Sequence, residues 1–168
     1  RRVVANHDTL RPIAEAAGHP FEVLPVRKES KAADFERYRQ MFEETEAELI
    51  ILARFMQIFP ESICKEYRER MINIHHSFLP AFAGAKPYHQ AFERGVKIIG
   101  ATSHYVTSDL DAGPIIEQEV RRIDHHHRPA DLRRLGKDCE CLALSRGVRY
   151  HATDRVLVHG NKTIVFRF

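Results

Sequence analysis

Short apolar runs alternate along the chain with longer segments in which apolar side chains recur every three or four positions. The runs are rich in β-branched residues, and this pattern is typical of strands. They predict strands at 3–5, 21–26, 49–53, 71–75, 98–107, 114–123, 155–159 and 163–168. The periodic segments predict helices at 9–17, 31–47, 60–70, 88–94 and 129–150.

This alternation of strands and helices predicts an α/β domain: an open, mostly parallel, twisted sheet of the Rossmann-like kind, with helices on both faces. The run 49–53 is apolar at every position, as expected of a central parallel strand covered on both sides. Helix 31–47 carries one apolar stripe, formed by Phe35, Tyr38, Met41 and Phe42. Such sheets bind ligands beyond the carboxyl ends of their strands, so the residues that follow 49–53 and 71–75 deserve the closest reading.

Composition narrows the classes of function. The 168 residues suit one domain, 43% of them are apolar, and the net charge is only +3, which is no nucleic-acid footprint. No apolar run approaches the roughly 20 residues of a membrane span, so we expect neither a nucleic-acid nor a membrane partner. Cys64, Cys139 and Cys141 form no disulfide framework and indicate reduced thiols in the cytoplasm.

Asn73 and His75 lie two apart at the end of a predicted strand, so their side chains share one face while Ile74 enters the core. An amide donor beside an imidazole suits acyl chemistry, since one can hold an oxyanion and the other can move a proton. A solvated, polar strand end is the alternative, and spacing alone favours that alternative.

Two loops offer further candidates. In the loop 108–113, Asp111 is a possible base or electrostatic partner for His75, whereas Asp109 suits a turn. His104 precedes this loop in a strand and either faces the site or is structural. The loop 53–59 can hold a flat heterocycle between Met56, Ile58 and Phe59, or can simply pack the next helix.

Two other segments remain ambiguous. The apolar loop 77–85 carries Pro and Gly and can wall a pocket or serve as a buried connection. The run His125-His126-His127 suggests a metal site at first sight. Adjacent side chains in a strand or turn diverge, however, so we expect a polar loop there and no metal.

Taken together, these motifs resemble the folate formyltransferase family. The resemblance rests on Asn73-Ile74-His75, on the stretch 77–80, on Asp109-Leu110-Asp111-Ala112-Gly113-Pro114, and on the interval between Asn73 and Asp111. Within the family the chain is most similar to the deformylases. The segments that carry this similarity are 5–8, 10–12, 53–57, 73–82, 84–92, 99–107 and 155–163.

The resemblance implies hydrolysis of 10-formyltetrahydrofolate to formate and tetrahydrofolate, which supplies formate for purine biosynthesis and balances one-carbon folate pools. It implies a catalytic triad of Asn73, His75 and Asp111, with Asp111 favouring a charged His75. The pterin of the folate would lie against the loop 54–59 and the loop 106–111. The residues implied in folate binding are Arg54, Phe55, Met56, Gln57, Phe59, His104, Val106, Asp109 and Leu110.

The same resemblance implies no metal, no nucleotide and no cofactor beyond the folate substrate, and it favours a homo-oligomer. It also implies that residues 1–168 form a catalytic domain without its first strand and without the amino-terminal ACT-type regulatory domain of the family's deformylases. Two alternatives stay open. One is formyl transfer to an amine such as glycinamide ribonucleotide, and the other is a non-catalytic folate-binding module.

Overall fold

Strand β4 (Met71–His75) organises the fold, because it pairs with a parallel strand on one side and an antiparallel strand on the other. The computed structural model describes residues 1–79 and 87–167. Part of the segments 77–85, 73–82 and 84–92, to which the sequence pointed, therefore lies outside the described residues. In chain order the described elements are β1 (Val3–Ala5), a 3-10 turn (Asp8–Leu10), α1 (Arg11–Ala16), β2 (Phe21–Val23), α2 (Lys31–Glu44), β3 (Ile50–Ala53), α3 (Glu61–Glu66), β4, α4 (Pro87–Glu93), β5 (Ile98–Tyr105), β6 (Ile115–Arg122), α5 (Pro129–Ala152), β7 (Val156–His159) and β8 (Lys162–Val165).

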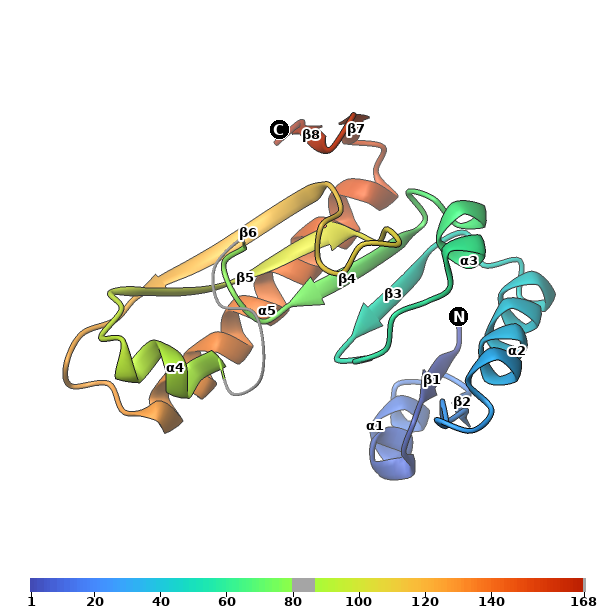
Figure 1. Ribbon diagram of the computed structural model, residues 1–168, viewed down its shortest axis with the longest axis horizontal. Helices are drawn as coiled ribbons and strands as arrows, with labels where there is room; N and C mark the ends of the chain where they lie inside the picture. Colours follow the sequence, from blue (N-terminus) through green and yellow to red (C-terminus); the bar gives the residue numbers. More distant parts are fainter. Residues whose placement is uncertain (80–86, 168) are drawn as a thin grey trace.

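The strands form a four-stranded sheet in the order β3-β4-β5-β6 and two separate pairs, β1-β2 and β7-β8 (Figure 1). The expectation of a mostly parallel sheet was wrong. The pairs β1-β2 and β3-β4 are parallel, but β4-β5, β5-β6 and β7-β8 are antiparallel. The fold is α/β with mixed sheets.

Connection length explains one of the two antiparallel pairings of the main sheet. A parallel crossover needs roughly a dozen residues or more, and residues 106–114 between β5 and β6 are too few for one. Between β4 and β5, helix α4 has seven residues and spans about 10 Å. It packs against α5, and residues 76–97 are enough for a parallel crossover, so length alone does not set the direction of β5.

A second expectation also failed, since β3 is not a central strand. In the part of the chain that the structure describes, β3 pairs with β4 alone, and the side chain of Ile51 is largely exposed. The apolar run is explained instead by one buried face. Ile50 belongs to the core on the side of α2, and the partly buried Leu52 packs against the same cluster.

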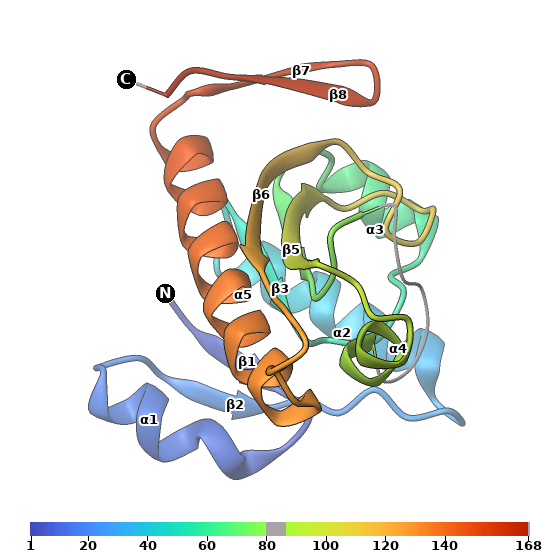
Figure 2. The same ribbon diagram turned by 90° about the vertical axis from the view of Figure 1, so that its left-hand side faces the viewer.

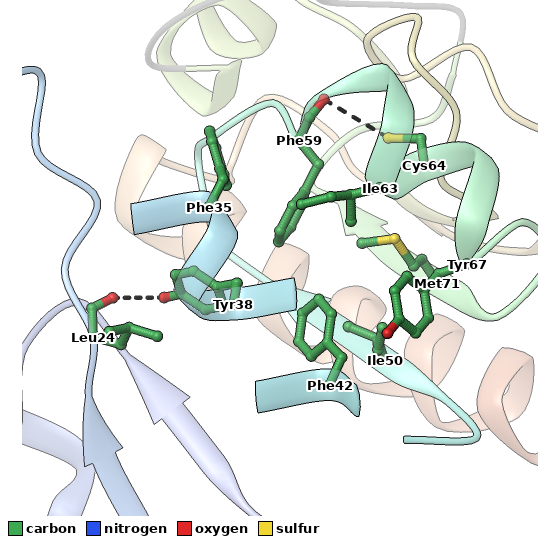
Figure 3. Close-up of a cluster of buried hydrophobic side chains, with 10 residues drawn as sticks. All are labelled: Leu24, Phe35, Tyr38, Phe42, Ile50, Phe59, Ile63, Cys64, Tyr67 and Met71. Carbon is green, nitrogen blue, oxygen red and sulfur yellow. Dashed lines mark hydrogen bonds between the residues drawn. The ribbon is translucent and has the colours of Figure 1, made fainter. Parts of the chain in front are cut away.

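Helices cover both faces of the sheet, as predicted. On one face, Ile72 and Ile74 pack with residues of α5, which runs along β4, β5 and β6 (Figure 2). On the other face, Ile50 and Met71 meet α2 and α3 in an aromatic cluster (Figure 3). The predicted stripe of α2 is confirmed, because Phe35, Tyr38 and Phe42 are buried there and Met41 packs against them. The complete cluster comprises Leu24, Phe35, Tyr38, Phe42, Ile50, Phe59, Ile63, Cys64, Tyr67 and Met71.

Close approach of α5 to the sheet depends on Gly147. A Cβ atom at this position would lie 2.4 Å from Oγ of the fully buried Ser103 on β5. Real Cβ atoms do not approach so closely, so a side chain here would force the helix away from β5. Because α5 also carries one wall of the cavity described below, this contact sets where that wall stands.

We expect Gly147→Val to lower the free energy of unfolding by about 1–3 kcal/mol, because overpacking a tight contact displaces the helix. Urea denaturation followed by circular dichroism measures the change. Ser145→Val is the matched control, since Ser145 is exposed on the same helix and receives the same β-branched side chain. Equal denaturation midpoints for the two variants would contradict the role given to Gly147.

Candidate active site

The end of β4 delivers two polar side chains to one side of the sheet. Met71, Asn73 and His75 point away from α5, whereas Ile72 and Ile74 pack toward it, so the predicted alternation is confirmed. His75 is almost completely buried, although it sits at the last position of the strand.

Asp111 comes to this strand end from the loop between β5 and β6. Its carboxylate Oδ2 lies 3.1 Å from Nδ1 of His75. The backbone of Asp111 has a φ of 52°, in the left-handed region that non-glycine residues rarely adopt. Asp109, expected to be a turn former, is exposed, and its carbonyl accepts a hydrogen bond from the hydroxyl of Thr107.

His104 links Asn73 to Asp111. Antiparallel pairing sets His104 directly opposite Asn73, and Nδ2 of Asn73 lies 3.2 Å from Nε2 of His104. The same Nε2 is 3.6 Å from Oδ1 of Asp111, while Nδ1 lies 2.8 Å from the carbonyl oxygen of Tyr105. A neutral imidazole accepts from Asn73, and a protonated one donates to Asp111. The four side chains therefore form a connected chain: Asn73, His104, Asp111 and His75.

Burial and neighbouring charges both shift the pKa values of His75 and Asp111, but a different influence dominates for each group. The hydrogen bond from His104, followed by the charges of the two histidines, holds the pKa of Asp111 below its ordinary value, although burial opposes this. Burial lowers the pKa of His75 and outweighs the attraction of Asp111. Asp111 thus favours a charged His75, as expected, but burial prevails in the free site: the imidazole is neutral at pH 7 and donates through Nδ1 to Asp111. Nε2 of His75 is buried and has no hydrogen-bond partner among the described residues.

These side chains line a cavity of about 830 Å³. A volume of this size is typical of a small-molecule site. All twelve residues expected to take part in catalysis or folate binding lie on its wall. The lining is Leu52, Arg54, Phe55, Met56, Gln57, Ile58, Phe59, Asn73, Ile74, His75, His76, Tyr88, His89, His104, Val106, Thr107, Asp109, Leu110, Asp111, Arg133 and Glu140. The structure thus brings the predicted residues together, and their individual roles stay predictions.

The loop after β3 offers alternate side chains to the core and to the cavity. Phe55 and Phe59 stack with ring centroids 4.9 Å apart, and Tyr38 meets both rings edge-on. Phe59 is buried in the cluster of α2, so it is not free to sandwich a ligand from both sides (Figure 3). Met56 is 80% exposed and Ile58 is also exposed, so these two side chains remain available to an apolar ligand.

Several lining residues were missed by sequence reasoning, among them Tyr88 and Glu140. The hydroxyl of Tyr88 donates to Oε1 of Glu140 over 3.0 Å, and the guanidinium of Arg54 contacts both oxygens of that carboxylate. Burial and the carboxylate of Glu140 raise the pKa of Tyr88. Tyr88 lies in the segment 84–92 that carries the resemblance, and Glu140 lies on a helix with no local motif, so their contact follows only from the packing of α4 on α5.

The histidine run also differs from expectation. We predicted that adjacent imidazoles would diverge, but the ring centroids of His125 and His126 are 3.9 Å apart. The turn after β6 folds back on itself, since the backbone amide of His126 donates to Asp124 over 3.0 Å. One ligand atom from each of Asp124, His125 and His126 lies within 4.8 Å of the others, which is close enough for one ion, and all three residues are exposed. They lie outside the lining of the 830 Å³ cavity.

Comparison with known proteins places the chain in a family. The sequence profile of the formyl transferase family matches residues 1–148. The chain therefore belongs to the formyl transferase family.

Within that family, deformylases are prominent among the similar proteins. A formyltetrahydrofolate deformylase of Corynebacterium sp. (strain P-1) is 48% identical over 98% of this chain and 58% of the relative. The crystal structure of a formyltetrahydrofolate deformylase from Pseudomonas syringae pv. tomato is 51% identical, with a TM-score of 0.94, over 99% of this chain and 56% of that one. Phosphoribosylglycinamide formyltransferase from Anaplasma phagocytophilum is 32% identical, with a TM-score of 0.88, over 99% of this chain and 81% of that one. The chain thus spans little more than half the length of these deformylases.

No helix among the described residues is both long enough and apolar enough to cross a membrane. The three cysteines are free thiols, as expected, with Cys64 and Cys139 buried and Cys141 exposed.

We expect Asp111→Asn to lower the pKa of His75 further, because the carboxylate is the main influence that opposes burial. Titration of the imidazole by NMR measures the shift. Asp109→Asn is the control, since it removes a carboxylate from the exposed part of the same loop and should leave His75 unchanged. A higher pKa in the Asp111 variant would refute this electrostatic account.

Proposed function

We propose that the protein containing this chain hydrolyses 10-formyltetrahydrofolate to formate and tetrahydrofolate, with residues 1–168 acting as its catalytic domain. One observation carries the proposal: Asn73, His75 and Asp111 converge on one cavity in a chain about half identical to formyltetrahydrofolate deformylases. Formate released in this way would enter purine biosynthesis and balance the one-carbon folate pools.

The cavity offers two chemically distinct sides to such a substrate. Exposed apolar side chains, Met56, Ile58 and Leu110, suit the flat pterin ring of the folate. Asn73, His75 and Asp111 lie on the polar side, where the formyl carbon would be held. Arg54, Gln57 and the other lining residues complete the binding surface in this proposal.

The reaction begins with water and Asp111. A water molecule adds its oxygen to the formyl carbon, and one of its protons passes to the carboxylate of Asp111, which is ionised at pH 7 because its pKa is low. The carbonyl oxygen becomes an oxyanion. Asn73 has a second N–H besides the one directed at His104, and this N–H can donate to the oxyanion.

His75 contributes through its connection to Asp111. Nδ1 already carries the proton of the neutral imidazole and donates it to the carboxylate over 3.1 Å, so His75 holds Asp111 in place and takes no second proton there. Only Nε2, which is buried and without a partner among the described residues, can be protonated, and an Nε2–H that gains its proton from solvent before water adds would donate to the oxyanion. The bond from carbon to N10 breaks, N10 takes the proton, and formic acid leaves and ionises to formate.

Transfer to an amine is the second candidate, because it uses the same tetrahedral chemistry. Its support is the likeness to phosphoribosylglycinamide formyltransferase structures. The lower identity to that structure, 32% against 51% for a deformylase, favours hydrolysis.

The proposed hydrolase needs no cofactor beyond its folate substrate, no metal and no nucleotide. Free thiols are in keeping with a cytoplasmic location. A homo-oligomer is expected by resemblance alone. Formate release from 10-formyltetrahydrofolate by the full-length protein, with no amine present, tests the proposal directly. Activity that appears only after glycinamide ribonucleotide is added would replace hydrolysis by transfer.

We expect Asp111→Asn to abolish formate release while folate binding persists, since the amide cannot take the proton of water. His75→Ala should have the same effect. Single-turnover formate assays and fluorescence titration with a folate separate the two properties. Near-normal release by either variant would remove it from the proposed machinery.

We expect Asn73→Ala to slow formate release by about 100- to 1000-fold, the usual loss when one oxyanion donor is removed. The effect should fall on kcat, with a small change in KM, because the oxyanion exists only after water has added. Steady-state kinetics measures both constants. A change confined to KM would show that Asn73 binds the ground state instead.

A further inference from the structure

Three polar side chains from three elements meet at the wall of the cavity. The guanidinium of Arg54 lies 3.1 Å and 3.3 Å from the two carboxylate oxygens of Glu140, and the hydroxyl of Tyr88 donates to the same carboxylate over 3.0 Å. Arg54 follows β3, Tyr88 is on α4 and Glu140 is on α5. We refer to this arrangement as the Arg54–Tyr88–Glu140 bridge.

The register of the sheet places Arg54 beside the catalytic strand end. Ala53, the last residue of β3, pairs with Ile74 of β4. Arg54 therefore leaves the sheet next to the position of His75, and its side chain crosses to α5.

The packing of α5 places Glu140 at the same level. Ile74 packs against Cys139 and Ala143 of α5, and these two residues flank Glu140 along the helix. Gly136 leaves room for Tyr88 to pack closely on α5, because a Cβ atom at this position would collide with the ring and hydroxyl of Tyr88. The bridge therefore spans the cavity wall adjacent to His75.

The bridge joins an exposed cation to a buried carboxylate, since the side chain of Arg54 is 60% exposed. The side chain of Glu140 is only 12% exposed, and its carboxylate has two donors from different elements. Arg54 adopts a φ of 55°, a backbone conformation that favours glycine. Strained backbone at a non-glycine residue is found mostly at functional sites, so the conformation of Arg54 suggests a functional role for its side chain.

We propose that this bridge decides which nucleophile reaches the formyl carbon, so that Arg54 and Glu140 are specificity-determining residues. The inference rests on the proposed function. Water occupies about 30 Å³ and needs no groove of its own. An amine carried on a larger molecule needs an open approach along the cavity wall, and the bridge closes the wall between β3 and α5.

Both outcomes use the same balanced step. When water attacks, a C–O bond forms, the C–N10 bond breaks, and N10 takes the proton that the water gives up. When an amine attacks, a C–N bond forms instead, the amine gives up one proton, and N10 takes it, which leaves a formamide and tetrahydrofolate. The ratio of formamide to formate therefore reports the nucleophile alone.

The test uses the full-length protein, 10-formyltetrahydrofolate labelled with ¹³C in the formyl group, and glycinamide ribonucleotide as the amine, whose formylglycinamide product is quantified together with formate by NMR. Wild type should give labelled formate. Arg54→Gly opens the bridge while it suits the left-handed backbone, so the chain keeps its fold. We expect it to raise the ratio of formylglycinamide to formate by about tenfold or more, and we expect a smaller rise for Glu140→Gln.

Arg133→Ala is the matched control. Arg133 lines the same cavity but lies outside the bridge, so its loss changes the charge equally and should leave the product ratio unchanged. An equal rise in this variant would assign the effect to charge and overturn the proposal, as would a wild-type ratio in Arg54→Gly.

A binding measurement keeps the two proposals separable. Glycinamide ribonucleotide should bind to Arg54→Gly and not to the wild-type protein in titration calorimetry, whether or not formate is released. Equal heats would overturn the bridge proposal alone. A wild-type protein that forms only formylglycinamide would overturn both the bridge and the hydrolase.

Discussion

The antiparallel pairing of β4 with β5 is the constraint on which the rest of the site depends. It sets Asn73 directly opposite His104, so an amide and an imidazole meet across two adjacent strands. The chain then leaves β5 into the loop that returns Asp111 to the same strand end. With a parallel β5, residue 104 would lie elsewhere along β4, and the loop after β5 would open at a different place. Strand direction thus comes before any individual contact in the site.

Around this pairing, each wall of the cavity is fixed to a different part of the core. The loop after β3 is tied to α2 through stacked Phe55 and Phe59. The opposite wall belongs to α5, which approaches β5 closely at Gly147. The titrating groups sit between these walls, where burial moves the pKa of His75 downward while hydrogen bonding moves that of Asp111 in the same direction. The free site therefore combines a neutral base with an ionised acid, held 3.1 Å apart.

Local patterns in the sequence were enough for the elements and for the faces of the strands. The alternation from Met71 to His75 and the stripe of α2 were read correctly because each depends on near neighbours in the chain. The direction of β5 was misjudged, since strand pairing is a long-range property and the pattern of apolar residues is the same in either direction. The edge position of β3 and the folded-back turn of His125 and His126 were not predicted either, because the apolar pattern does not determine them.

The candidate site was foreseen where a motif carried it and missed where only tertiary packing did. Asn73, His75 and Asp111 were named from motifs of the chain, and they do meet around one cavity. Phe59 lies on the cavity wall and is also buried in the cluster of α2, because an apolar residue after a strand can serve the core and the cavity at once. Tyr88 and Glu140 lie 52 positions apart on two different helices, so their contact could not be read from the chain.

Arg54, Met56 and Asp111 all hold left-handed backbone conformations within the loops that surround the cavity. Each costs the folded state of order 1 kcal/mol relative to a relaxed residue. Selection for heat resistance would therefore be drawn to these three positions, where glycine relieves the backbone. Directed evolution for thermal stability would favour glycine at these positions, whereas selection for turnover would favour the present side chains. In thermostable descendants of this protein, a position that keeps its non-glycine residue should therefore be one that activity requires.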